Sequence, residues 1–171
     1  LITHDGMSIR FNEADVRSMG RPATGVRGIN LEAADTVVAL AILVPEATLL
    51  VVGGNGLGKR TRFEEYRVQS RGGKGIITMK TTERTGGVVG ALTVREQDEI
   101  MLITTGGQMV RINVRYIRET GRNAQGVKLI NLEAGDQLQA IAPVIAEEVG
   151  EAEGLEPGEV TPPTPEPPQV G

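Results

Sequence analysis

The chain has 171 residues, of which 39% are hydrophobic and only 2% aromatic, so its core has to be built from aliphatic side chains. It contains no cysteine and a single histidine, which excludes disulfides and thiolate metal sites and leaves His4, in a polar turn, unable to form a zinc site alone. The net charge of −4 hides a segregation, because all 18 Lys and Arg lie within residues 1–144 and residues 145–171 carry acids but no base.

The chain begins at Leu1, inside an apolar strand-like segment and without an initiator Met, so we expect it to be a fragment of a longer protein. Three segments then repeat one another almost without gaps, namely residues 1–44, 49–94 and 100–144. Two sets of glycines recur at matching places: Gly6, Gly56 and Gly107 in the first set, and Gly25, Gly75 and Gly126 in the second. Such a period is typical of a stacked repeat architecture.

Each repeat predicts the same succession of short strands. An apolar strand, such as residues 49–52, meets a tight turn at the first glycine, and a second strand completes a hairpin. A polar connector follows, the second glycine opens a third strand, and an apolar segment such as residues 88–91 closes the repeat. Four short strands in a repeat of this length are typical of a propeller-type blade, which buries its faces against neighbouring blades. The prediction is an all-β domain over residues 1–145, with three four-stranded blades.

The last segment of the chain has a different composition. Residues 146–171 are rich in proline and glutamate, low in hydrophobic residues and charged with one sign. Such a segment cannot bury enough apolar surface to offset the entropy lost on ordering. We therefore predict a disordered acidic tail.

Arginines also recur at equivalent places in the repeats. The aligned sets are Arg10, Arg60 and Arg111; Arg17, Arg67 and Arg118; and Arg21, Arg71 and Arg122. The last two sets fall in the connectors, so stacked blades would present a curved basic edge, and a periodic row of arginines can neutralise successive DNA phosphates. Because phosphate contacts position a protein without reading bases, the prediction is binding to duplex DNA of any sequence. The alternative is that these arginines pair with acids of their own repeat, such as Glu13, Glu64 and Glu119.

The connector of the second repeat carries a further signal. It reads Gln69-Ser70-Arg71-Gly72-Gly73-Lys74-Gly75. Glycines let the backbone approach a ligand closely and expose its amides, and the two cations add positive charge. We therefore predict phosphate binding by six residues of this segment: Gln69, Arg71, Gly72, Gly73, Lys74 and Gly75.

This heptapeptide resembles the box Gln-Arg-Arg-Gly-Gly-Lys-Gly of the C-terminal DNA-wrapping domain of the bacterial DNA gyrase A subunit, from which it departs only at Ser70. Flanking segments 17–21, 55–61 and 121–127 are similar to the same family, and the resemblance extends from residue 1 to about residue 144. It implies a β-pinwheel, a propeller-like ring of about six blades in the intact domain, with DNA wrapped around its rim to enable negative supercoiling. The family's defining box belongs to the first blade, so the box here would be a second copy in a later blade.

The resemblance also implies the partners. These are duplex DNA, the rest of the gyrase A subunit, plus the gyrase B subunit, in a cytoplasmic A2B2 assembly. ATP and Mg²⁺ would serve the parent complex, and no cofactor is expected in this fragment. Membrane association is not expected, because no apolar run approaches the roughly 18 residues of a membrane-spanning helix.

Two motifs that look catalytic are rejected. Residues 53–59 nearly spell a P-loop, but Arg60 stands where Mg²⁺ binding needs Ser or Thr, and the repeat makes this segment a hairpin. Arg115-Tyr116 resembles the start of the topoisomerase cleavage motif, but Tyr116 aligns with surface positions and Tyr66 with core positions. No His or Cys is placed to activate a nucleophile, so the fragment by itself is not expected to be an enzyme.

Two alternative functions stay open from the sequence. One is the corresponding domain of topoisomerase IV, whose boxes are usually degenerate, unlike residues 69–75. The other is a propeller-like scaffold for protein interactions, which the repeated arginines at one blade edge disfavour.

Overall fold

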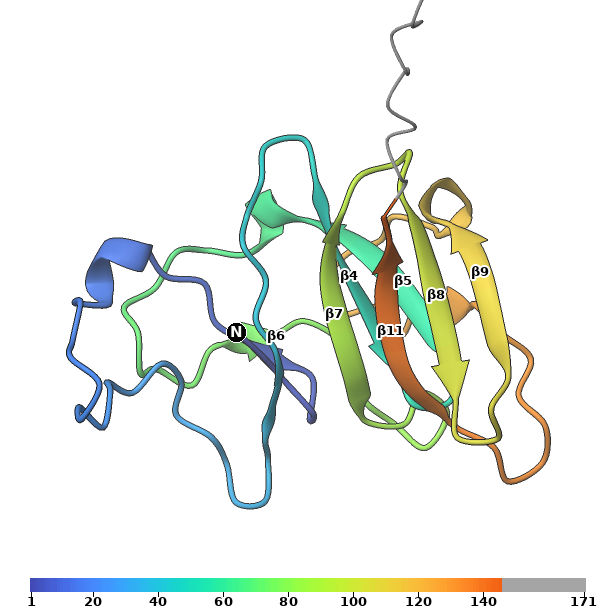
Figure 1. The fold of residues 1–171 in the computed structure, drawn as a ribbon, viewed down its shortest axis with the longest axis horizontal. Helices are drawn as coiled ribbons and strands as arrows, with labels where there is room; N and C mark the ends of the chain where they lie inside the picture. The colour runs from blue at the N-terminus through green and yellow to red at the C-terminus, as the bar shows by residue number, and fades with distance from the viewer. Residues whose placement is uncertain (146–171) are drawn as a thin grey trace, which may run out of the picture.

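The computed structural model describes residues 1–145, and the predicted acidic tail, residues 146–171, lies outside the described residues. The described part is all-β, as predicted, with antiparallel sheets, three single 3-10 turns and no α-helix within residues 1–145 (Figure 1). None of these turns is long and apolar enough to cross a membrane. The elements are β1 (Ile2–Thr3), β2 (Met7–Ser8), η1 (Glu13–Asp15), β3 (Val37–Ala39), β4 (Thr48–Gly53), β5 (Leu57–Arg62), η2 (Phe63–Glu65), β6 (Ile76–Ile77), β7 (Val88–Val94), β8 (Glu99–Thr104), β9 (Met109–Asn113), η3 (Val114–Tyr116), β10 (Val127–Lys128) and β11 (Leu138–Val144).

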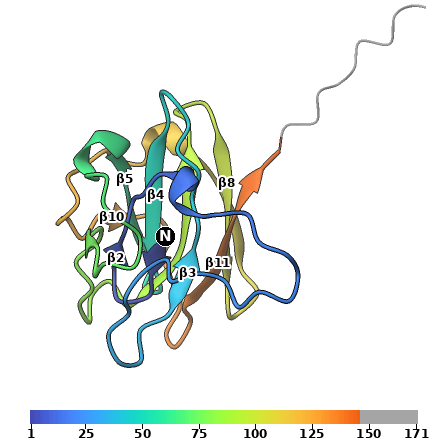
Figure 2. The same ribbon diagram turned by 90° about the vertical axis from the view of Figure 1, so that its left-hand side faces the viewer.

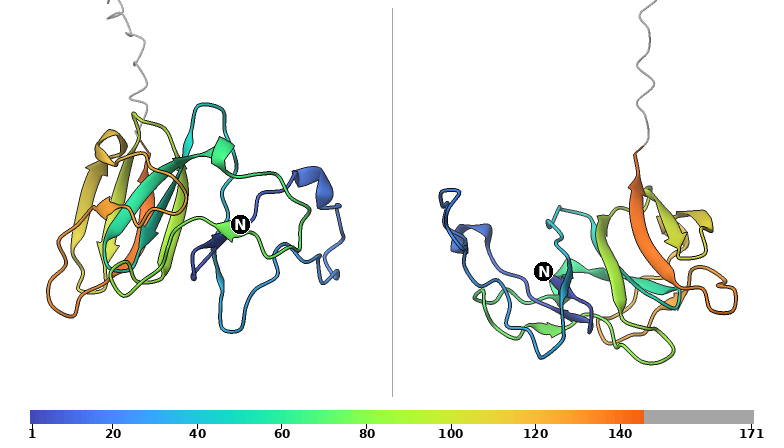
Figure 3. Two further views of the ribbon diagram at one scale, coloured as in Figure 1. Left: turned by 180° about the vertical axis from the view of Figure 1, so that it is seen from behind. Right: turned by 60° about the horizontal axis from the view of Figure 1, so that its bottom comes forward.

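The strands form three sheets, one around the hairpin of each repeat. The first has the order β3-β1-β2-β6, the second β10-β5-β4-β7, and the third β11-β8-β9. The closing strands pack against one another, β3 against β7 and β7 against β11, so the repeats follow one another as successive blades. Figure 2 looks from the side of the first repeat, whose short strands β2 and β3 lie in front of the later sheets. In Figure 3 the first connector, drawn in blue, extends away from those sheets.

The third strand of a repeat belongs to the sheet of the preceding repeat. Thus β6 pairs with β2, with Met7 opposite Ile77, and β10 pairs with β5, with Val127 opposite Gly58. The prediction that each repeat builds its own four-stranded blade is wrong in this respect. The third sheet has three strands within residues 1–145, and the expected strand at Gly25-Val26 is not formed there. The pattern of a short apolar strand does not specify its partner, and the open backbone groups of the neighbouring hairpin provide one.

Strand β4 lies between two cores. Because side chains alternate along a strand, Leu49 and Val51 enter the cluster shared with the first repeat, while Leu50 and Val52 enter the cluster shared with the third. All six residues of β4 are buried. Each fully buried aliphatic side chain of this kind contributes about 1.5–3 kcal/mol. The aliphatic core therefore extends between repeats, which join into one body.

Candidate nucleic-acid interface

Each hairpin runs into a 3-10 turn, and the second residue after that turn is an exposed arginine. Two of the turns are capped by asparagine: Asn12 Oδ1 accepts a hydrogen bond from the Ala14 amide at 2.9 Å, and Asn113 Oδ1 accepts one from the Arg115 amide at 3.3 Å. The exposed residues, here called the rim arginines, are Arg17, Arg67 and Arg118. Within the part of the chain that the structure describes, their side chains make no hydrogen bond or ion pair. They therefore offer one unengaged cation per repeat at equivalent positions.

The first aligned set of arginines has a different role. Arg10 Nη1 donates hydrogen bonds to the carbonyl oxygens of Phe63 at 2.9 Å and Tyr66 at 3.1 Å. Arg60, only 8% exposed, donates from Nε to the carbonyl oxygen of Ile117 at 2.8 Å. Each guanidinium thus binds the backbone around the 3-10 turn of the next repeat. These donors are turned into the joint between repeats, which gives both arginines a structural role, and DNA contact by them stays a prediction.

Arg111 completes this set in the third repeat, where the described residues contain no following repeat. Its side chain is exposed and its Nε donates to Glu99 Oε2 at 2.8 Å. Of the acids considered as partners within a repeat, Glu119 pairs with Arg62 of the preceding repeat, Nε to Oε1 at 2.5 Å. Ion pairs of the described residues therefore form both within a repeat, as at Arg111–Glu99, and between neighbouring repeats, as at Arg62–Glu119.

The third set, in the connectors, also reaches the preceding repeat. Arg71 donates from Nε to the carbonyl oxygen of Asp15 at 2.9 Å and from Nη1 to that of Arg27 at 3.2 Å. Arg122 donates from Nη1 to the carbonyl oxygen of Ile77 at 2.8 Å. Positions 27 and 77 are equivalent, so the same contact is made twice. A guanidinium has five N–H donors, so these contacts leave both arginines donors for phosphate. Arg21 is exposed.

The glycines of the box serve packing between repeats. Gly75 has φ +76°, and a Cβ there would lie 2.2 Å from the carbonyl oxygen of Ser8. At the equivalent Gly126 a Cβ would lie 2.4 Å from the carbonyl oxygen of Gly58. The Gly72 amide donates to the carbonyl oxygen of Gly28 at 2.6 Å. The prediction that this amide is exposed to a ligand is therefore wrong, because the preceding repeat uses it.

The remaining box residues lie at the same boundary. Lys74 Nζ forms an ion pair with Glu32 Oε1 at 3.0 Å, and both side chains are exposed. The equivalent contact in the next repeat joins Gln125 Nε2 to Thr82 Oγ1 at 3.3 Å. Gln69 is half-buried, and its Nε2 has no hydrogen-bond partner among the described residues. The box therefore presents Lys74, and part of Arg71, to solvent.

A family model described as DNA gyrase C-terminal domain, beta-propeller, matches three segments of the chain, residues 1–43, 47–95 and 98–145, which together make up most of it. The chain belongs to this family. The bounds of the three matched segments agree closely with those of the three repeats that the sequence predicts. The resemblance to the gyrase A C-terminal domain is thereby confirmed, as is the propeller-type all-β fold.

Curated relatives of the chain are DNA gyrase A subunits, in agreement with the family model. The DNA gyrase A subunit of Salmonella typhimurium is 47% identical over 158 residues, which cover 90% of this chain and 18% of the relative. That of Mycobacterium leprae is 43% identical, with 83% of this chain and 11% of the relative covered. The chain thus spans less than a fifth of the length of these curated relatives.

Solved structures share the fold. "Structure of DNA gyrase A C-terminal domain" matches with a TM-score of 0.79 at 30% identity, covering 84% of this chain and 49% of that one. "Crystal structure of the C-terminal domain of DNA topoisomerase IV" matches with a TM-score of 0.78 at 24% identity, covering 84% and 45%. The second likeness shows the fold alone.

Sequence reasoning missed one polar residue of this gyrase domain that the structure places at a joint. Lys59, the last residue of the rejected P-loop-like segment, is 0% exposed, and its Nζ donates to the carbonyl oxygens of Gly121 and Arg122. The internal alignment held a usable signal, because Ile9 and Val110 occupy the same position in the other repeats. A lone lysine at an otherwise aliphatic position indicates a specific partner.

The rejected motifs lie where the sequence placed them. Residues 53–59 form the turn and adjoining strand ends of the β4–β5 hairpin, as predicted. Tyr66 is 4% exposed and its hydroxyl contacts Thr78 Oγ1 at 2.7 Å, so burial raises the pKa of this phenol. Tyr116 is 72% exposed and lies under the Arg115 guanidinium, 5.0 Å from its ring centre. The predicted core and surface assignments of the two tyrosines are confirmed.

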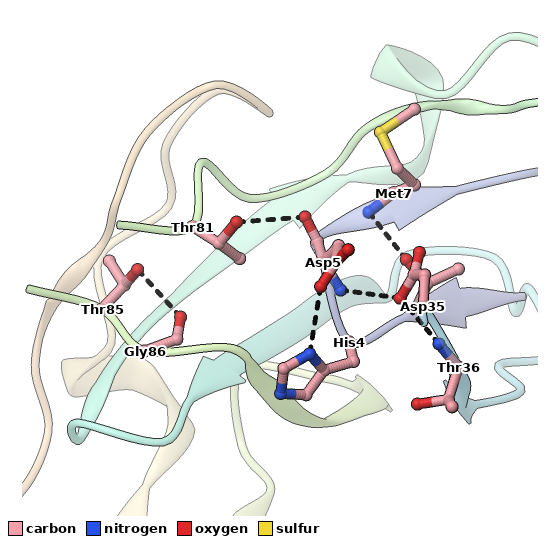
Figure 4. Close-up of polar contacts among 9 residues, drawn as sticks. His4, Asp5, Met7, Asp35, Thr36, Thr81, Thr85 and Gly86 are labelled. Atoms are coloured by element: carbon pink, nitrogen blue, oxygen red, sulfur yellow. Dashed lines mark hydrogen bonds and ion pairs between the residues drawn. The ribbon is translucent and has the colours of Figure 1, made fainter. Parts of the chain in front are cut away.

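One other polar cluster of the domain has the composition of a metal site. His4, Asp5 and Asp35 place ligand-type atoms within 4.8 Å of one another (Figure 4). However, Asp35 Oδ1 already accepts hydrogen bonds from the amides of Asp5 at 3.0 Å and Thr36 at 2.8 Å. Its counterpart in the third repeat, Asp136, accepts from the amides of Gly106 and Gln137 without any histidine nearby. The recurring aspartate therefore links the hairpin turn to the start of the closing strand through hydrogen bonds to backbone amides.

Proposed function

We propose that this domain binds duplex DNA through its phosphates, without sequence preference, and bends it along the edge that carries the rim arginines. The observation that supports this most directly is the exposure of one arginine per repeat, at equivalent positions, without a partner in residues 1–145. Phosphates recur along DNA, so cations at equivalent positions on successive blades can neutralise them in turn. Lys74 and the free donors of Arg71 and Arg122 extend the same basic edge.

The names of the relatives support a place for this domain in gyrase. We propose that it acts as part of a gyrase A subunit, with the gyrase B subunit in an A2B2 assembly in the cytoplasm. There it would wrap DNA so that the ATP- and Mg²⁺-dependent parts of the complex introduce negative supercoils. In this proposal the domain contributes binding and bending, needs no cofactor, and leaves strand cleavage to other parts of the complex.

The topoisomerase IV domain is the second candidate, favoured by a shared fold. The greater identity to the gyrase A structure, and the near-intact box at residues 69–75, support gyrase. A DNA-topology assay tests for the wrapping that is proposed for the gyrase domain. Constrained wrapping changes the linking number of a plasmid relaxed in the presence of the protein, whereas binding without wrapping does not.

The proposal is tested with the triple variant Arg17→Ala, Arg67→Ala, Arg118→Ala. Losing three phosphate contacts should lower the affinity for a DNA duplex on the order of 10²–10³-fold at low salt, and should reduce the salt slope by about three. The fold should survive, because all three side chains are exposed.

The matched control removes three other exposed cations, as Lys80→Ala, Arg84→Ala, Arg95→Ala. Equal losses in both triple variants would contradict a specific rim and leave only general electrostatic attraction. Affinity of the unaltered protein that is independent of salt would contradict phosphate binding altogether and favour the protein-interaction scaffold.

A further inference from the structure

Lys59 is buried, but its charged group does not serve the apolar core: it binds the connector of the third repeat. Its Nζ donates hydrogen bonds to the carbonyl oxygens of Gly121 at 2.6 Å and Arg122 at 2.5 Å, both in the connector of the third repeat. Burying an ammonium group is unfavourable unless hydrogen bonds replace its hydration. The two carbonyls supply that replacement, so the side chain and the connector depend on each other.

The same connector is held from a second side. Glu65 Oε2 accepts a hydrogen bond from the Arg122 amide at 3.1 Å, and Arg122 reaches the carbonyl oxygen of Ile77. The joint between the first two repeats lacks this arrangement, because Ile9 stands in the position of Lys59 and the connector itself supplies the cation, Arg71, toward Asp15. The third connector has no Gly-Gly-Lys box, and a cation beneath it fixes its path instead.

The internal repeat shows that packing does not require this lysine. Ile9 is 2% exposed in the first repeat, and Val110 is half-buried in the third. An aliphatic side chain therefore satisfies the blade at this position. The presence of a lysine is instead explained by its hydrogen bonds to the connector backbone, which follows Arg118 and carries Arg122.

We propose that Lys59 is a positioning residue for DNA binding, which fixes the third connector so that Arg118 and Arg122 face the same edge as the box. The inference rests on the proposed DNA-binding function, whose failure the experiment below distinguishes from its own.

The charge state of Lys59 provides a readout. Burial lowers the pKa of Lys59 to about 8, the Glu65 carboxylate opposes that shift, and the Arg122 guanidinium adds to it. The charged clasp is therefore complete below that pH and is lost above it. Because the folded pKa lies below the ordinary value, the buried charge costs stability below about pH 8, and this cost is relieved as pH rises from there toward the ordinary pKa. Replacing Lys59 with an aliphatic residue should thus not destabilise the fold.

The experiment compares the unaltered chain with Lys59→Ile and, in case a branched side chain packs badly, Lys59→Met. We expect hydrogen exchange of the Thr120 and Arg122 amides to accelerate about tenfold, as for the loss of one charge-assisted hydrogen bond. The denaturation midpoint should stay equal or rise. DNA affinity at neutral pH should fall about threefold to tenfold, the share of one misplaced phosphate contact.

The pH profile separates positioning from simple charge. The unaltered protein should lose DNA affinity as the pH passes from below 8 to above it, and both Lys59 variants should lack that step. Lys128→Met, which removes an exposed lysine of the same sheet, should keep both the step and the protection of the connector. A step that persists in the Lys59 variants would belong to another group, such as the Leu1 amine, whose pKa burial lowers from 8.0, and would overturn the inference.

Two further results would also decide the matter. Unchanged amide exchange and unchanged affinity in both variants, with normal DNA binding by the unaltered chain, would overturn the inference and leave the proposed function intact. Failure of the unaltered chain to bind DNA at low salt would overturn the proposed function, and Lys59 would then be a clasp between repeats only.

Discussion

The joints between repeats and the rim beyond the 3-10 turns both carry arginines at a fixed period, yet the two regions use them differently. At the joints, the Arg60 guanidinium is buried against the carbonyl oxygen of Ile117, and Arg10 makes the same kind of contact one repeat earlier. On the rim, Arg17, Arg67 and Arg118 extend into solvent without a partner in the described residues. A recurring arginine is thus a property of the repeat, whereas its role depends on whether a neighbouring backbone lies within reach.

The difference follows from hydrogen-bonding capacity. An arginine inside a joint replaces the water lost by buried carbonyls, so its removal leaves acceptors unsatisfied. An exposed arginine is fully hydrated and can exchange that water for phosphate at little cost to the fold. Mutations in the two regions should therefore separate stability from DNA binding.

The largest expected effect is at a glycine of a joint. Gly75→Ala should lower the free energy of unfolding by about 3–5 kcal/mol, because a Cβ clashes with the Ser8 carbonyl and φ is positive. Gly25→Ala, with similar φ and nothing within 4 Å, should cost only about 1–2 kcal/mol. Denaturant unfolding of both variants measures the difference. Equal costs would mean that the joint does not constrain position 75.

The next effect compares two arginines of one aligned set. Arg60→Ala should cost about 2–3 kcal/mol, because the Ile117 carbonyl loses a charged donor in a buried site. Arg111→Ala, which removes an exposed pair with Glu99, should cost at most about 1 kcal/mol. Urea midpoints at fixed salt test the pair. If Arg111→Ala proved as damaging as Arg60→Ala, the distinction between joint and exposed arginines would fail.

A pH-dependent effect on stability is expected at Asp136, whose hydrogen bonds lie within one repeat and not between repeats. Hydrogen bonds from Thr104, Thr105 and backbone amides hold the pKa of Asp136 at about 2, below its ordinary 3.8. Its contribution to stability is therefore present above about pH 4 and is lost as the pH falls toward 2.

Asp136→Asn keeps an oxygen acceptor but cannot titrate, so it should flatten that part of the acid stability profile. The profile is followed by denaturant midpoints at several pH values, with Glu133→Gln, in the same loop, as control. An unaltered acid profile in Asp136→Asn would assign the acid sensitivity to other carboxylates.

The smallest expected effect is at the box. Glu32 forms an exposed ion pair with Lys74, and Thr82 stands at the position of Glu32 in the next repeat. Glu32→Thr should free the lysine for phosphate and raise DNA affinity about twofold to fivefold, within the range of an exposed pair. Glu83→Thr makes the same charge change at a neighbouring site of the second repeat. Equal gains in the two variants would reflect net charge alone.

Several features could be predicted from the sequence because they are local. Turn glycines mark the hairpins, apolar alternation marks the strands, and the alignment of repeats assigns Tyr66 to the core and Tyr116 to the surface. The arginine sets and the box are likewise visible in the chain. Each of these features depends on residues that are near one another in sequence, or on comparison of equivalent positions.

Partner choice, in contrast, was decided only by the tertiary structure. Strands β6 and β10 join the preceding sheet, Arg60 meets the Ile117 carbonyl, and Lys59 meets the third connector. These contacts join residues of adjacent repeats that are far apart in the chain, and the hydrogen-bonding groups on both sides are common to many positions. Periodicity therefore determined that this protein is an array of blades with recurring cations. Packing determined which cations close the joints and which stay free for a phosphate, because a donor is committed only when a buried acceptor lies within bonding distance.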